Sequence, residues 1–450
     1  MTADQFHDVP ERITPYIISA NLDEQVHLLS GPFRLIGSTE AVLHADLNLR
    51  WSPSVAIEFD GTYDVPFSGI EGQWTLMSEG DINFSVPVIV TQVILGSEAS
   101  AVRGIAASTL NIGRGPFRRL RFCLANFPSY RGKSIHFEHE GMSGLTLGRL
   151  EVATEEGVCQ IDTIPESKDL VEAAERNGGF VISHVGEWIP ATGVMSAKEA
   201  ESILGMLHFW FGLLRGAWAG PLFPQGINDD QTIVWRQFDN GRLRESRQVA
   251  TWLPERAPLD LSKAFHGFVQ RWNEDVWRDS LVTSISWFVE ANAIGTANES
   301  RVVLAQVALE LLSWVLLVEE QRLCHPGDFE KISAAGRIRA LLHHVGVPTD
   351  VPGYLDSLQA LCDVDAFDGP GIIAKVRNAL VHPTKKKRVL MESVNGEQRM
   401  ECAQLALQYL DLVILAVCGH DGYYSRRGWR GWKGIDNNEV RVPWKDKREA

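Results

Sequence analysis

The sequence lacks several patterns that would assign it at once to a common class of enzyme. It contains no GxSxG, Walker A or HExxH pattern, so serine-hydrolase, NTPase and zinc-protease chemistries have no support. Its six cysteines form no CxxC pair, and their spacing indicates neither a zinc site nor a disulfide framework. We therefore expect buried free thiols in a reducing compartment, and no metal or cofactor.

The chain also has little that resembles a targeting or membrane segment. The N-terminus, MTADQFHDVPERITPYI, lacks the basic stretch and apolar run of a secretory signal. The longest apolar run, Val302–Val318, is interrupted by Gln306 and Glu310, which makes it short and polar for a membrane span. We therefore expect a cytoplasmic protein with no membrane partner.

The composition is otherwise that of an ordinary globular protein. The chain has 450 residues, 45% apolar and 22% charged, which suits two or three domains. A formal net charge of -14 argues against a general nucleic-acid binder. The charge is uneven, however, because residues 371–450 hold 15 basic and 9 acidic residues while residues 1–370 hold 28 and 48. The basic C-terminal end is therefore the part that favours an anionic partner.

Hydrophobic periodicity predicts an α+β protein. Residues 1–250 contain short alternating runs such as AVLHADLNLRW, separated by turns, which is typical of a β sandwich or barrel. A helix is expected near residues 196–215, where Ser196 and Glu199 form a capping pattern. From 255 to 425 the apolar residues recur three or four apart and predict an all-α bundle, which a basic tail at 426–450 follows.

One helical segment, GPGIIAKVRNALVHPTKKKR (residues 369–388), carries a polar trio. Asn378 and His382 are four residues apart and share a helix face. Arg377 lies roughly 140° around the axis from His382, but its side chain is long enough to reach the same pocket. Pro383 disfavours helix at His382, which is therefore expected in the last turn, where the helix C-terminus favours a protonated imidazole.

These residue types suit cleavage of RNA without a metal ion. His382 would move a proton at neutral pH, Arg377 would stabilise charge on the scissile phosphate, and Asn378 would orient one of them. The basic run that follows would hold the RNA backbone: Lys385, Lys386, Lys387 and Arg388. The competing interpretation is a solvated helix end with a capping histidine and an exposed basic loop.

The RNALVHP segment resembles the signature of HEPN domains, which are helical bundles with an Arg, a polar residue and a later His. Many HEPN domains are metal-independent ribonucleases of toxins and phage defence, and they act as dimers with two motif helices facing one cleft. The resemblance implies that Arg377 and His382 are catalytic, that Asn378 supports them, and that the bundle forms a homodimer. A β-rich part before such a bundle is also similar to ApeA-like anti-phage proteins.

A narrow polar stripe runs along the most apolar helix. Gln306, Glu310 and Ser313 are spaced i, i+4 and i+7. A buried carboxylate at Glu310 needs a partner, and Arg377 is one candidate. The alternative is a surface stripe on an otherwise buried helix.

A second basic cluster lies in the acidic N-terminal half. It either binds an anionic ligand or RNA, or pairs with neighbouring carboxylates. Its members are Arg114, Arg118, Arg119, Arg121, Arg131 and Lys133.

The sequence thus predicts a metal-independent endoribonuclease that acts as a toxin or defence effector. It would leave 2′,3′-cyclic phosphate ends, and the β-rich region would sense an unknown trigger. The alternative is a non-catalytic module that binds a nucleotide or a protein and dimerises through its helices, with a ligand-binding β domain.

Overall fold

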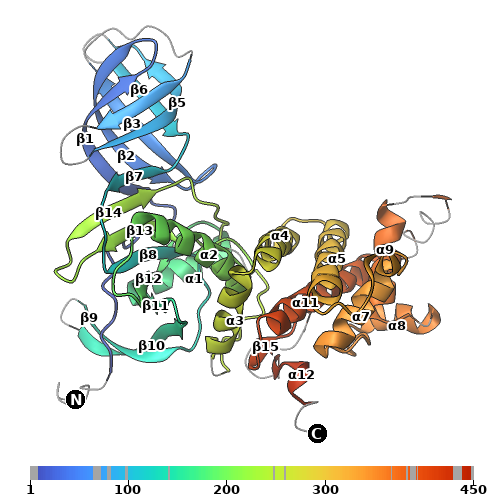
Figure 1. Ribbon diagram of the computed structural model, residues 1–450. Helices are drawn as coiled ribbons and strands as arrows, with labels where there is room; N and C mark the ends of the chain where they lie inside the picture. The colour runs from blue at the N-terminus through green and yellow to red at the C-terminus, as the bar shows by residue number, and fades with distance from the viewer. Residues whose placement is uncertain are drawn as a thin grey trace.

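The computed structural model describes residues 9–63, 72–78, 83–96, 100–139, 142–246, 249–257, 260–365, 367–381, 384–385, 392, 394–428 and 438–446. The described chain is rich in strands up to Phe238 and mostly helical from Ser262 onward (Figure 1). This confirms the α+β layout that the change in hydrophobic periodicity predicts.

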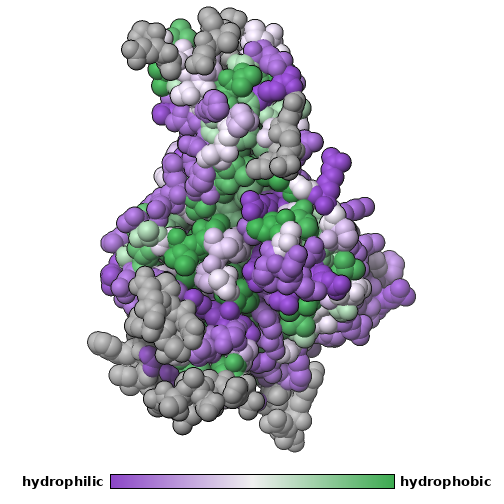
Figure 2. Space-filling model, turned by 90° about the vertical axis from the view of Figure 1, so that its left-hand side faces the viewer, coloured by the Kyte–Doolittle hydropathy of each residue, from purple (hydrophilic) through white to green (hydrophobic). Residues whose placement is uncertain are grey.

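The first six strands close into a barrel with the order β1-β2-β3-β6-β5-β4. Alternate residues of β2 are buried, so Leu43, Ala45 and Leu47 fill the interior while their neighbours face out. Seen from the side, the barrel forms a narrow lobe above a wider body (Figure 2). Its strands are β1 (Val26–Ile36), β2 (Glu40–Arg50), β3 (Ala56–Tyr63), β4 (Trp74–Ser78), β5 (Phe84–Ile94) and β6 (Ser100–Ala106).

An open eight-stranded sheet lies next to the barrel, with the order β7-β14-β13-β8-β12-β11-β10-β9. Leu120, Phe122 and Leu124 alternate along β8 and project into the main apolar core. The strands are β7 (Leu110–Gly113), β8 (Arg119–Ala125), β9 (Lys133–His139), β10 (Met142–Ala153), β11 (Gly157–Thr163), β12 (Ile182–Pro190), β13 (Leu222–Ile227) and β14 (Ile233–Phe238).

Helix α2 (Ala197–Arg215) covers the apolar face of this sheet. Its N-terminus has the expected capping box, in which the Ser196 hydroxyl accepts from the Glu199 N–H and the Glu199 carboxylate accepts from the Ser196 N–H at 2.7 Å. Phe211 packs against Phe122 of β8 with ring centroids 5.7 Å apart. The helix ends at Gly216, whose φ of 76° favours glycine.

The helical region is built around α11 (Gly396–Val417), which packs against α4, α5, α7 and α8. Most of α11 is buried, in keeping with its central position. The remaining elements are η2 (Pro165–Ser167), α1 (Lys168–Asn177), α3 (Ser262–Trp272), α4 (Asp275–Asn292), α5 (Asn298–Trp314), the π-helical turn η3 (Val315–Glu320), α6 (Pro326–Phe329), α7 (Ala334–Val345), α8 (Asp356–Asp365), α9 (Gly369–Val381), β15 (Tyr423–Ser425), β16 (Glu439–Arg441) and α12 (Pro443–Asp446).

Buried hydrogen bonds join the helical region to the β-rich region at the end of α4. The Asn292 amide donates to the carbonyls of Gly216 and Ala250, both at 2.8 Å. Arg427 in turn donates to the Asn292 side chain at 2.7 Å and forms an ion pair with Asp411 of α11. We call Asn292, Asp411 and Arg427 the junction cluster.

Two helical segments are long and apolar enough to cross a membrane by length and composition alone. They are Asn298–Glu320, which joins α5 and η3, and Gly396–Val417, which is α11. In their most apolar windows, 61% and 78% of the residues are buried inside the protein. Burial of this extent is what the core helices of a helical bundle show.

Candidate functional site

The structure places the first two residues of the polar trio near the C-terminal end of α9. Arg377 and Asn378 are both half-buried there. His382, Lys386, Lys387 and Arg388 lie outside the described residues. Lys385 is exposed. The structure therefore describes two of the three residues of the trio, and whether they form a site with His382 stays a prediction.

An ion pair fixes the opposite end of α9. Arg339 of α7 donates two hydrogen bonds to Asp368, at 2.6 and 2.7 Å, and the Gly371 N–H donates to the same carboxylate at 2.8 Å. Burial acts to raise the pKa of Asp368, but these hydrogen bonds outweigh it and lower that pKa. The N-terminal turn of α9 is thereby held against α7.

The carboxylate of Glu310 has a different partner from the one considered in the sequence. It accepts a hydrogen bond from the Gln306 amide at 2.8 Å and forms an ion pair with Arg337 of α7 at 3.4 Å. The structure shows no ion pair between Glu310 and Arg377 among the described residues. Gln306 and Ser313 are fully buried, so the stripe does not lie on the surface.

Fewer guanidinium nitrogens of Arg377 than of Arg337 have hydrogen-bond partners among the described residues. One guanidinium nitrogen, Nη1, donates to the neighbouring Asn378 side chain at 3.2 Å. The Nε atom is buried and has no hydrogen-bond partner among the described residues, and neither do Gln306 Oε1 and Arg337 Nε. These three atoms belong to α5, α7 and α9, which pack against one another.

We call Arg377 and Asn378 of α9, together with Gln306, Glu310 and Arg337 on the two helices packed against it, the α9 cluster; no hydrogen bond or ion pair among the described residues joins the pair on α9 to the other three. Two cations and one anion belong to it, so it carries a net charge of about +1. The guanidinium of Arg337 is neutralised by Glu310, whereas that of Arg377 has no carboxylate partner in the described part of the chain. A half-buried guanidinium with free donors suits a phosphate oxygen, which it can bind through two parallel hydrogen bonds.

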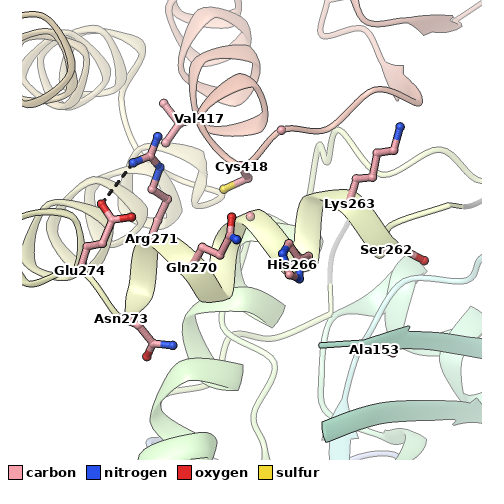
Figure 3. A pocket seen from close by; sticks show the side chains of 12 residues that line it. Ala153, Ser262, Lys263, His266, Gln270, Arg271, Asn273, Glu274, Val417 and Cys418 are labelled. Carbon is pink, nitrogen blue, oxygen red and sulfur yellow. Dashed lines mark hydrogen bonds and ion pairs between the residues drawn. The ribbon is translucent and has the colours of Figure 1, made fainter. Parts of the chain in front are cut away.

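A cavity of about 900 Å³ lies elsewhere, where α3 meets β10 and the end of α11 (Figure 3). The imidazole of His266 and the amide of Gln270 line it. Its cations are already paired within the protein, because Lys263 contacts Asp421 and Arg271 contacts both Glu274 and Glu320. None of the sequence-predicted site residues lines this cavity.

Sequence reasoning missed both Arg337 and the cavity lining. Arg337 lies in a predicted helix with no motif around it, and only the packing of α7 on α5 brings it to Glu310. His266 and Gln270 lie on an ordinary amphipathic helix, and their neighbours in the cavity come from the distant ends of β10 and α11. A local pattern holds no signal for either arrangement.

Two parts of the chain match known protein families. Residues 114–249 match the model of the YopA central domain, and residues 274–435 match that of the YopA C-terminal domain. The chain is also 22% identical over 417 residues to the SPbeta prophage-derived uncharacterized protein YopA of Bacillus subtilis (strain 168). This match covers 90% of the present chain and 92% of the Bacillus protein. No solved structure matches the chain.

The HEPN resemblance is therefore wrong. The helical region that carries RNALVHP matches the YopA C-terminal domain, and no HEPN family is found. The physical reason is that an Arg, an Asn and a His within six residues form a short pattern that any helical bundle can contain. The match to the YopA C-terminal domain extends over residues 274–435, whereas RNALVHP spans seven residues.

Proposed function

We propose that the α9 cluster binds the sugar-phosphate backbone of RNA. We further propose that this site, together with His382, cleaves RNA without a metal ion. The observation that carries the proposal is the Arg377 guanidinium, half-buried and without a carboxylate partner among the described residues. Such a group gains more from an incoming phosphate than an arginine already engaged in an ion pair. The exposed Lys385 lies just beyond the end of the helix and adds to the attraction.

In this proposal the 2′-oxygen of RNA attacks the neighbouring phosphorus and the bond to the 5′-oxygen breaks. His382 takes the 2′-hydroxyl proton or gives one to the leaving oxygen. Arg377 stabilises the additional negative charge at phosphorus, and Asn378 holds the guanidinium in place. The products are a 2′,3′-cyclic phosphate and a 5′-hydroxyl end.

The setting proposed for this activity is the cytoplasm, with two copies of the chain associated through their helical regions. The similar Bacillus protein is prophage-derived, which fits a toxin or defence effector. Lys386, Lys387 and Arg388 are proposed to extend the contact with RNA, and an unknown trigger is proposed to act at the β-rich region.

The test is cleavage of purified RNA by the full-length protein in EDTA. Arg377→Met and His382→Ala are compared with Arg278→Met and His44→Ala, which change exposed residues on α4 and on the barrel strand β2, outside the α9 cluster. We expect the first two variants to lose cleavage by at least about a hundredfold and the last two to keep it. Cleavage that survives in His382→Ala, or that requires a divalent metal, would overturn the mechanism.

A non-catalytic binding module remains the second candidate. It is favoured by Arg377 itself, because this guanidinium can hold a phosphate whether or not a proton-transfer group acts on it. In the same assay this candidate predicts RNA or nucleotide that is bound by the wild type, released by Arg377→Met and recovered intact.

A further inference from the structure

A row of polar residues crosses the eight-stranded sheet on the face turned away from α2. Each residue lies directly opposite the next one in the strand register. The alternate positions Leu120 and Trp188 project into the core that α2 completes, so the row projects from the other face. We call this set the polar row: Glu151 on β10, Gln160 on β11, Glu187 on β12, Arg121 on β8, Gln225 on β13 and Arg236 on β14.

Two separate sets of hydrogen bonds hold the first half of the polar row, one at Glu151 and one at Glu187. Glu151 accepts from the Gln160 amide at 2.9 Å. Glu187 is only 3% exposed, and its two oxygens are held by Arg121 at 2.9 Å and by Arg119 at 3.4 Å. Each oxygen of this buried carboxylate therefore accepts a hydrogen bond from an arginine.

The other end of the polar row has no such partners. Arg236 is half-buried, and its Nε atom is shielded from solvent without a hydrogen-bond partner in the described chain. No carboxylate among the described residues forms an ion pair with Arg236. In the strand register, Gln225 lies opposite Arg236 on one side and opposite Arg121 on the other. A shielded donor without an acceptor destabilises the free protein, and a ligand oxygen would relieve that.

The N-terminal segment borders this end of the row. The Tyr16 hydroxyl donates to the Phe223 carbonyl of β13 at 2.8 Å. Burial raises the pKa of Tyr16 well above its usual value, and the charges of Arg121 and Arg236 act against that rise. Arg121 on β8 and Arg236 on β14 flank β13, the strand to which this hydroxyl is bonded.

Charge counting indicates what kind of group would fit. Two cations of the basic N-terminal cluster are neutralised one to one, since Arg118 pairs with Asp229 and Lys133 pairs with Glu151. At the row, Arg119 and Arg121 share the carboxylate of Glu187, and Arg236 has no ion pair among the described residues. This leaves a local charge of about +2, which matches a phosphate monoester with close to two negative charges at neutral pH.

We infer that the Arg121–Gln225–Arg236 end of the polar row binds a small ligand through a terminal phosphate group. Arg236 would supply bidentate hydrogen bonds, Gln225 would donate through its amide, and Arg121 would add charge while it stays fixed on Glu187. These residues fall within 114–249, the range that matches the YopA central domain. The site is separate from the α9 cluster, and its test does not depend on RNA cleavage.

The experiment titrates the full-length protein with inorganic phosphate and with adenosine 5′-monophosphate at constant ionic strength. Binding is followed by calorimetry and by the shift in melting temperature. Sodium acetate is the control for a monovalent carboxylate. The variant Arg236→Gln removes the cation that has no ion pair among the described residues. Arg118→Gln is the matched control, because Arg118 is an exposed arginine already paired with Asp229.

We expect saturable binding of both phosphate probes by the wild type and by Arg118→Gln. Arg236→Gln should weaken that binding by at least about tenfold, because it loses charge-assisted hydrogen bonds. Equal binding of acetate and phosphate would contradict the preference for a dianion. Unchanged phosphate binding in a folded Arg236→Gln protein, or no saturable binding by the wild type, would overturn the inference.

Discussion

The junction cluster and the α9 cluster each contain an arginine, and they differ in how many partners that arginine has within the described protein. In the junction cluster Arg427 is 3% exposed, contacts both oxygens of Asp411, donates to Asn292 and lies over the Phe288 ring at 5.3 Å. In the α9 cluster Arg377 is half-buried, and its hydrogen-bond partner among the described residues is its neighbour Asn378. A charge enclosed by its own partners contributes to holding the fold, whereas a charge with donors to spare can contribute to binding.

The largest expected effect comes from breaking the closed cluster. Asp411→Asn leaves the Arg427 guanidinium buried without its anion, and we expect a loss of about 3–5 kcal/mol in the free energy of unfolding. Denaturation in urea, followed by circular dichroism, measures this. A loss below about 1 kcal/mol would mean that the cluster is not needed for the junction.

The control replaces both charges with apolar side chains, Asp411→Leu with Arg427→Met. Since no unpaired charge is left in the interior, much of the lost stability should return. The double variant also removes the hydrogen bond to Asn292, so recovery is expected to be incomplete. A double variant that is less stable than Asp411→Asn would contradict this account.

A smaller effect on the free energy of unfolding is expected from a buried histidine in the eight-stranded sheet. His184 of β12 is 3% exposed, its ring stacks against Tyr130, and its Nε2 atom has no partner in the described chain. Burial lowers the pKa of His184 to about 3. In the unfolded chain His184 binds a proton as the pH falls through about 6.5, whereas in the folded chain it stays neutral down to a much lower pH. His184 alone should therefore reduce the free energy of unfolding by about 2 kcal/mol as the pH falls from 7 to 5.

The measurement compares the free energy of unfolding at pH 7, 6 and 5 for the wild type and His184→Asn. The variant should lose stability less steeply as the pH falls. Part of the slope should persist, because burial also lowers the pKa of His208 to about 4. Parallel curves for the two proteins would show that His184 is protonated normally in the folded state.

Local patterns predicted those elements whose signals are themselves local. The helix α2 was correctly expected, because Ser196 and Glu199 cap it within a single turn. Alternation predicted strands before residue 250, but it does not say which strands pair, so it could not distinguish the closed barrel from the open sheet beside it.

The sites were harder to predict, because they depend on which helices and strands become neighbours. From the sequence, Arg377 is a candidate ion-pair partner for Glu310. In the structure the packing of α7 on α5 brings Arg337 to that carboxylate instead. The polar row was not visible at all, since Arg121 and Arg236 are far apart in sequence and only the register through Gln225 aligns them.

The smallest expected effect on stability is at Arg377, and it sharpens the comparison most directly. Because this guanidinium has no ion pair among the described residues, Arg377→Met should change the free energy of unfolding by no more than about 0.5 kcal/mol, while it removes anion binding. Arg427→Met, the same substitution in the closed cluster, should destabilise the protein by several-fold more, because Asp411 is then buried alone. Urea denaturation of both variants side by side tests this. Equal losses would mean that Arg377 has a structural role like that of Arg427, and the proposal of a free phosphate-binding group on α9 would then fail.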